Sequence, residues 1–203
     1  MARGFRRRGS GRGATYTAQL DPLERATIAG LMDQVHALLE PEPVTEGGDA
    51  FASIVAGLGM GVTVAPEDQA DLDASAARRD PALDRLLPTA NREDDEAAAE
   101  FRRLTETGLR HRKATVLETA AALLRAEDKV RLDEPQARAL LTALTDVRLV
   151  LGERMGLRTD ADVEALEAAA PDLDPDDPLG YALAVYDFLT WLQETLASAM
   201  LDA

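Results

Sequence analysis

Apolar residues recur at helical spacing along most of this chain, beginning with the stretch between Asp21 and Glu40. Asp21 is suited to cap a helix, Pro22 to occupy its first position, and Glu24 completes the spacing of a capping box. The apolar positions that follow fall on one helix face, which predicts one buried side: Ile28, Leu31, Met32, Val35, Leu38 and Leu39.

Two further helices are predicted in the middle of the chain. Asp80 and Pro81 can open a short helix that Pro88 ends, with Leu83, Leu86 and Leu87 pointing inward. A long helix begins near Asp94 and continues to about Glu127. Its inward side is predicted from the apolar spacing: Ala98, Phe101, Thr105, Leu109, Val116, Ala120 and Leu123. A basic block, residues 110–113, then lies in mid-helix, where charged neighbours are the favoured explanation for it.

The last third of the chain predicts one core helix and one short helix. Asp133 caps the first, Pro135 lies in its first turn and Gly156 ends it. Its apolar stripe is regular and predicts a core position: Ala139, Leu140, Ala143, Leu144, Val147 and Leu151. The short helix is expected to follow Asp160.

The final helix, opened by Asp177 and Pro178, is apolar almost all round. This pattern is typical of a helix at the centre of a fold or at an oligomer interface, here a possible homodimer. Central burial is the favoured alternative. The residues that leave so little polar surface are Leu179, Tyr181, Leu183, Val185, Tyr186, Phe188, Leu189, Trp191, Leu192 and Leu196.

A strand pattern occurs only near the start, where Tyr16, Ala18 and Leu20 alternate with polar residues after the flexible sequence GSGRG. The prediction is a mainly α, single-domain bundle of about five to six helices with a small β-hairpin in residues 1–20. Residues 41–79, rich in Pro, Gly and acids, are expected to form a variable, loop-rich insertion, and residues 80–203 the helical core.

Composition agrees with this fold and restricts the compartment. The 203 residues include only 4% aromatics, and Ala and Leu dominate, which favours helices. No apolar run reaches the length of a membrane span, and no apolar segment of a signal peptide follows the basic start. Because cysteine is absent, disulfides and thiol chemistry are excluded. We expect a cytoplasmic protein without a membrane association.

Charge is distributed unevenly, although the net charge is −15. Five of the 22 basic residues precede the first acid, Asp21, which leaves 17 basic against 37 acidic residues in the remainder. Arginines near one end can pair with phosphate or with an acidic protein surface. The favoured alternative is that they keep the edge of the hairpin unpaired, or pack on acids of the same chain. The five are Arg3, Arg6, Arg7, Arg8 and Arg12.

Recognisable reaction chemistry is missing. The two histidines, His36 and His111, have no evident triad partner and no zinc-site spacing, so both are expected at the surface. The sequence GLGMG lacks the third glycine of a dinucleotide-binding fingerprint, and Asp172, Asp174 and Asp176 lack the glycine and glutamate of a calcium loop. We therefore predict no enzyme, no metal and no cofactor.

Several segments resemble a known family. They are FRRRGSG, DPALDRLLP, REDD, EFRRLTETGLRHRK, LTALTDVRLVLGERMGL and YDFLTWLQETL, which together cover most of the chain outside residues 41–79. The chain is thereby similar to the actinobacterial family named domain of unknown function 2017, also named the oxidative-stress regulator family. It departs from the family pattern at Asn91, where the family has an aromatic residue.

The resemblance implies a small cytoplasmic protein with a regulatory role, encoded often near an adaptor of the Clp protease. A thiol-based redox sensor cannot operate in a chain without cysteine. The functional prediction is therefore a regulatory protein that binds another protein, in stress response or regulated proteolysis. The alternative is a nucleic-acid-binding transcriptional regulator using the N-terminal arginines, which the net charge disfavours. Predicted partner-binding residues are Arg6, Arg7, Arg8, Arg85, Arg92, Arg102 and Arg103. The alternative for the last four is that they tie the short helix to the long one through acids elsewhere in the chain.

Overall fold

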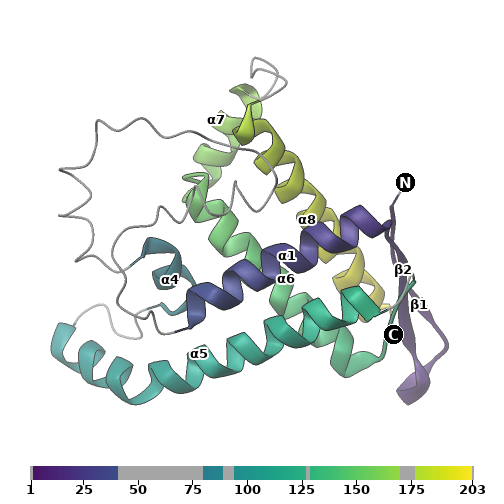
Figure 1. Ribbon diagram of the computed structural model, residues 1–203, viewed down its shortest axis with the longest axis horizontal. Helices are drawn as coiled ribbons and strands as arrows, with labels where there is room; N and C mark the ends of the chain where they lie inside the picture. Colours follow the sequence, from purple (N-terminus) through teal and green to yellow (C-terminus); the bar gives the residue numbers. More distant parts are fainter. Residues whose placement is uncertain (1, 41–79, 89–93, 127–128, 170–176, 203) are drawn as a thin grey trace.

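The computed structural model describes residues 2–40, 80–88, 94–126, 129–169 and 177–202. Helices dominate, so the predicted mainly α fold is confirmed (Figure 1). The expected insertion at residues 41–79 lies outside the described residues. In chain order the elements are β1 (Arg3–Arg8), the 3-10 turn η1 (Gly11–Gly13), β2 (Thr15–Gln19), α1 (Pro22–Leu39), α4 (Pro81–Leu86), α5 (Asp95–Ala126), β3 (Val130–Leu132), α6 (Glu134–Arg154), α7 (Asp160–Ala169) and α8 (Pro178–Leu201).

The predicted helix starts are confirmed by their hydrogen bonds. Asp21 accepts a bond from the backbone N–H of Glu24 at 2.8 Å, and the Glu24 carboxylate accepts from the N–H of Asp21, which completes the capping box. Asp133 forms the same reciprocal pair with Gln136. Similar side-chain caps begin two more helices, at Asp80 and Asp177. Four backbone N–H groups are thus satisfied by acids placed one residue before a helix.

The core is built around α6, which contacts α1, α4, α5 and α8. Its buried residues include the predicted Leu140, Leu144 and Val147. Helices α1 and α5 cross over one side of α6, and α8 lies against another (Figure 1). This arrangement leaves one end of the bundle to be closed by the sheet.

The sheet has a third strand that the sequence patterns did not predict. β2 pairs with β1 on one side and with β3 on the other, all antiparallel, so that Tyr16 faces Leu132 across the second pair. The side chains of one sheet face are buried against the helices: Phe5, Tyr16, Ala18, Val130 and Leu132. The hairpin therefore belongs to the core and is not an appendage.

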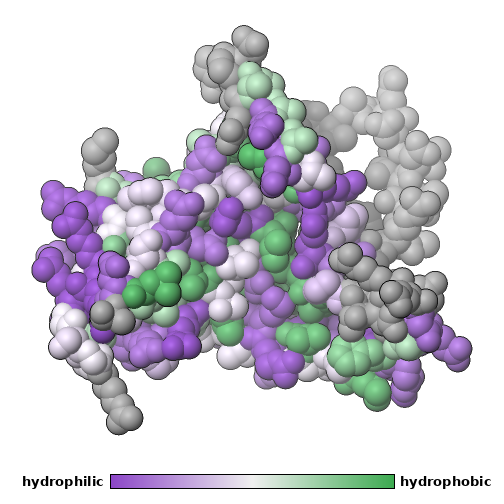
Figure 2. All heavy atoms as spheres, turned by 180° about the vertical axis from the view of Figure 1, so that it is seen from behind, coloured by the Kyte–Doolittle hydropathy of each residue, from purple (hydrophilic) through white to green (hydrophobic). Residues whose placement is uncertain are grey.

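The first half of α5 extends beyond the rest of the bundle (Figure 1). A helix of 32 residues is about 48 Å long, more than a bundle of this size can cover. Burial is confined to its second half, where Leu117, Ala120 and Leu124 are buried. The predicted inward position of Phe101 is wrong, since this residue is 50% exposed. Figure 2 shows apolar surface at this end of the molecule.

Helix α8 is less central than its composition suggests. One side is buried against α6 and β1, through Leu189, Leu192 and Leu196. The other side leaves Tyr181 and Trp191 exposed, and the Trp191 ring stacks on that of Phe188 with 5.7 Å between centroids. The favoured expectation of central burial is therefore wrong for one side of this helix, because no described element covers it.

Candidate functional site

The outer face of the sheet is polar throughout because side chains alternate along each strand. In β2, Tyr16 and Ala18 are buried, so Thr15, Thr17 and Gln19 point away from the helices. Neighbouring strands must present their own alternate residues on this same outer face.

A β-bulge decides which arginines of β1 reach the outer face. Pairing jumps from Arg3 opposite Gln19 to Arg6 opposite Thr17, so β1 has one extra residue between the two pairs. The extra residue brings both arginines to the exposed side, and Arg8 follows two residues later. Arg7 points the other way and donates a hydrogen bond to the backbone carbonyl of Asp202, at the end of α8.

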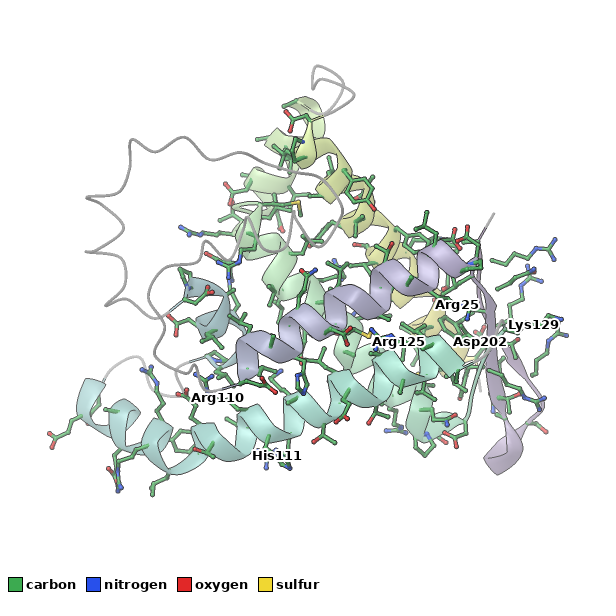
Figure 3. All side chains as sticks on the ribbon, in the orientation of Figure 1. Arg25, Arg110, His111, Arg125, Lys129 and Asp202 are labelled. Atoms are coloured by element: carbon green, nitrogen blue, oxygen red, sulfur yellow. The ribbon has the colours of Figure 1, made fainter. Side chains whose placement is uncertain are left out.

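The third strand adds two more cations. Arg131 is exposed and lies opposite Thr17, which has Arg6 on its other side. Because adjacent strands are about 4.8 Å apart, the backbones of Arg6 and Arg131 are separated by roughly 10 Å. Lys129, just before β3, is also exposed and lies at the outer side of the sheet (Figure 3). We call these five residues the basic face: Arg3, Arg6, Arg8, Lys129 and Arg131.

No side chain of the basic face has a hydrogen-bond or ion-pair partner among the residues that the structure describes. Most other described arginines are paired with acids, for example Arg125 with Asp33 and Arg138 with Glu134. Among the other Arg and Lys side chains that the structure describes, only Arg112, exposed in mid-helix on α5, has neither a hydrogen-bond nor an ion-pair partner. Unpaired cations are thus concentrated on one surface, and Figure 2 shows hydrophilic residues along that end of the molecule.

Protection of a sheet edge does not explain the arginines of β1. The edge of β1 is covered by α8, where the backbone N–H of Phe5 donates to the hydroxyl of Thr195 at 3.1 Å. Contact is so close that a Cβ atom added to Gly4 would lie 2.6 Å from the Thr195 methyl group. The expectation that the N-terminal arginines pack on acids of the same chain is not met for Arg3, Arg6 and Arg8, and Arg7 binds a backbone carbonyl instead.

A groove of about 850 Å³ runs beside the basic face, between the hairpin and the last turns of α8. Its walls combine apolar residues such as Phe5 and Ala199 with charged groups of both signs, Arg6, Arg7 and Glu194. A nucleophile held against a base is not found among these lining residues. The groove thus adjoins the basic face and is lined by apolar and charged side chains together.

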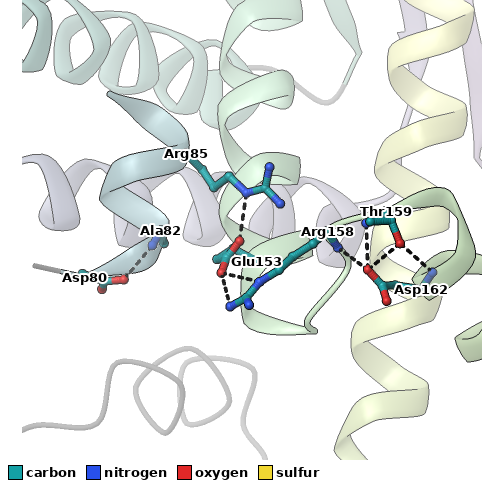
Figure 4. Close-up of polar contacts among 7 residues, drawn as sticks. All are labelled: Asp80, Ala82, Arg85, Glu153, Arg158, Thr159 and Asp162. Carbon is teal, nitrogen blue, oxygen red and sulfur yellow. Dashed lines mark hydrogen bonds and ion pairs between the residues drawn. The ribbon is translucent and has the colours of Figure 1, made fainter. Parts of the chain in front are cut away.

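The predicted site residue Arg85 lies elsewhere, at the contact between α4 and α6 (Figure 4). Its Nε donates to Glu153 Oε2 at 2.8 Å, while Arg158 binds the other carboxylate oxygen. Arg154 of α6 reaches back to Asp80 at the start of α4. Burial tends to raise the pKa of Glu153, but the hydrogen bonds from the two arginines hold it below its ordinary value.

The remaining predicted arginines do not join the hairpin. On the projecting half of α5, Arg103 binds Glu100 at 2.7 Å and Arg102 lies 3.9 Å from Glu106. Arg92 lies outside the described residues. Of the predicted set, Arg6 and Arg8 come together on the basic face. Sequence reasoning grouped Arg3 with these two but left it out of the predicted site. It missed Lys129 and Arg131, although the alternation in VRL at residues 130–132 is itself a strand signal.

One buried ion pair joins α5 to α6. Lys113 Nζ lies 2.6 Å from Asp146 Oδ1, and the Asp146 side chain is only 3% exposed. The second carboxylate oxygen, Oδ2, is buried without a hydrogen-bond partner. Burial raises the pKa of Asp146, and the bond from Lys113 lowers it only in part. With Arg110 bound to Glu106, this pair confirms that charged neighbours account for much of the basic block.

The described residues offer little else for chemistry. They contain no group of three or more His, Asp or Glu side chains that could hold a metal ion. His36 lies 3.8 Å from Glu40 and His111 is exposed on α5 (Figure 3). Within the described ranges, no helix has the length and apolar character needed to span a membrane.

Comparison with known proteins gives one match. The model of a family described as a domain of unknown function, DUF2017, matches residues 2–200. No curated protein and no solved structure matches the chain. The match extends over nearly the whole sequence, including both strands of the hairpin, β3 and the helices that support them.

Proposed function

The chain belongs to the DUF2017 family, and we propose that it works as a binding protein that docks a negatively charged macromolecule on its basic face, without catalysing a reaction. One observation carries the proposal. Five unpartnered cations share one polar surface in a chain whose net charge is −15. An enzyme mechanism has no comparable support, because the ion pairs among the described residues lie within one helix or tie two elements together.

Like charges on one face of a sheet repel each other, so this cluster does not favour folding. Along β1, Arg6 and Arg8 are about 7 Å apart at the backbone, since a strand rises about 3.4 Å per residue. Most of the other described arginines are neutralised by nearby acids. A surface that keeps this repulsion is well suited to receive anions from another molecule.

Two further parts of the functional prediction concern the regulatory role of the protein and its oligomeric state. A regulatory role, in stress response or regulated proteolysis and with a protein as the partner, is supported by the sequence resemblance and by the missing chemistry. The homodimer through α8 is supported by the exposed Tyr181 and Trp191. Both remain predictions that a measurement of partners and of mass in solution can test.

Retention on immobilised heparin, a general polyanion, tests the proposal. The wild-type chain should bind at low salt, and the double variant Arg6→Thr/Arg131→Thr should elute much earlier. Threonine suits a strand and already occupies this face, so the fold should persist. The control Arg112→Ala/Arg138→Ala removes two exposed helical arginines and the same net charge. Equal elution of the two double variants, or failure of the wild type to bind, would refute the proposed surface.

A further inference from the structure

We infer that the partner of the basic face is double-stranded nucleic acid, held through its phosphate backbone without reading the base sequence. The inference rests on the proposed function, because it names the chemistry of the anion that the same face would take. It depends on the composition of the face, on the direction of its aromatic residues and on its dimensions.

Composition favours phosphate over protein. Phosphate oxygens are contacted in protein–DNA complexes by Arg and Lys, with Thr and Gln as neutral donors. The outer face of the sheet presents these four residue types alone, through the five cations of the basic face and through Thr15, Thr17 and Gln19. A protein interface would need apolar or aromatic anchors at its centre, where charged residues are depleted. The central position here is Thr17, between two arginines.

The aromatic residues point away from the face, which favours a duplex over a single strand. Single-stranded nucleic acids are held by stacking their bases on exposed aromatic rings. The two aromatic residues of the sheet, Phe5 and Tyr16, are both buried against the helices. A duplex keeps its bases stacked and offers its phosphates outward, so it needs no such rings.

The dimensions of the face suit a groove of a duplex. Arg6 and Arg131 stand roughly 10 Å apart across the sheet, close to the width of about 12 Å of the major groove. Cations on the outer strands can therefore approach the phosphates of both nucleic-acid strands that border one groove. Thr17 lies between them and can donate from its hydroxyl.

The acidic remainder of the chain restricts how a duplex can approach. Asp21 lies two residues after β2 and Asp133 directly after β3, but each is occupied as a helix cap. The chain as a whole has a net charge of −15, which repels a phosphate backbone and disfavours contacts away from the basic face. Binding should be weak near physiological salt and should depend steeply on ionic strength.

Fluorescence anisotropy of a labelled DNA duplex of mixed sequence, titrated with the full chain, tests the inference. With four or five phosphate contacts, the affinity should fall roughly 100- to 500-fold between about 50 and 200 mM salt. For Arg6→Thr/Arg131→Thr, affinity at about 50 mM salt should fall roughly 100-fold, and the salt slope should decrease by about two. The control Arg112→Ala/Arg138→Ala should retain the wild-type affinity. A second duplex of different sequence should bind equally.

Two further probes separate this inference from the proposed function. Polyglutamate of similar charge and a single strand of the same sequence should both bind at least 10-fold more weakly than the duplex. If polyglutamate binds as tightly as the duplex and the Arg6/Arg131 variant loses both, the basic face stands as a binding surface and the nucleic-acid inference is wrong. Equal or tighter binding of the single strand refutes the choice of a duplex. If no polyanion binds, both proposals fail.

Discussion

Replacement of Lys113 by methionine should reveal how the buried Asp146 is tolerated. Methionine keeps the length of the lysine stem, so most of the packing between α5 and α6 is retained while the positive charge is lost. Asp146 then has neither its partner at 2.6 Å nor access to water, and its Oδ2 atom already has no hydrogen bond in the native chain. Removal of one member of a buried pair is strongly destabilising, because the other charge remains without compensation.

The size of the stability loss is limited because Asp146 can take up a proton and so lose its uncompensated charge. At pH 7 this costs about 4 kcal/mol, given an ordinary pKa of 3.8 and about 1.4 kcal/mol for each pH unit above it. The loss of stability caused by the missing charge therefore cannot exceed about 4 kcal/mol at pH 7. At pH 5 the same limit is about 1.5 kcal/mol. The wild type already carries part of this penalty, because burial raises the pKa of Asp146.

Urea unfolding followed by far-ultraviolet circular dichroism at both pH values would measure this effect. The difference between wild type and Lys113→Met should shrink by at least about half from pH 7 to pH 5. The double variant Lys113→Met/Asp146→Leu removes both charges and should regain most of the lost stability, since an apolar pair of similar volume often matches a buried ion pair. An equal loss at the two pH values, or a double variant less stable than Lys113→Met, would refute the argument.

Three other predictions concern the supports of the fold. Gly4→Ala should lower the free energy of unfolding by about 1–3 kcal/mol, because the new Cβ atom meets Thr195, whereas Gly13→Ala has open space and serves as the matched control; equal effects in urea titrations would contradict the close β1–α8 contact. Glu153→Gln should cost about 1–2 kcal/mol at neutral pH. Its lowered pKa means that this stabilisation is present above pH 4.5 and lost as pH falls through the folded-state pKa, so a difference that persists in acid would argue against it. Trp191, 37% exposed, should be quenched by acrylamide in a monomer; protection that increases with protein concentration would support the predicted homodimer through α8, and constant quenching would oppose it.

Local signals were sufficient for the helix boundaries. Asp21 with Pro22, and Asp133 with Pro135, place a cap and a proline within three residues, and hydrogen bonding within a single turn decides such starts. β3 was missed because three residues make too short a pattern, and the strand exists through its pairing with β2. Phe101 was misplaced because helical spacing specifies a face and does not reveal where the neighbouring elements end.

In the candidate site, too, local sequence identified some residues, while tertiary packing decided the role of others. The arginine cluster at the start of the chain was visible as composition, and Arg6 and Arg8 remain in the proposed surface. Arg85 was grouped with them by its charge and by the family resemblance, whereas its carboxylate partner Glu153 lies 68 residues away in sequence. No local pattern relates two such positions, so the pairing of one arginine and the freedom of another depend on the packing of α4 against α6.

The sequence by itself determined the mainly α fold, the capped helix starts, the hairpin and the excess of acid, because each depends on the order of residues within a turn or on a sum over the chain. Only the tertiary structure decided which charges remain without partners. The third strand places Arg131 beside Thr17, and the bulge in β1 brings Arg3 and Arg6 to the same side. Electrostatic interactions act over distances in space, so a binding surface is defined only when the folded chain has set those distances.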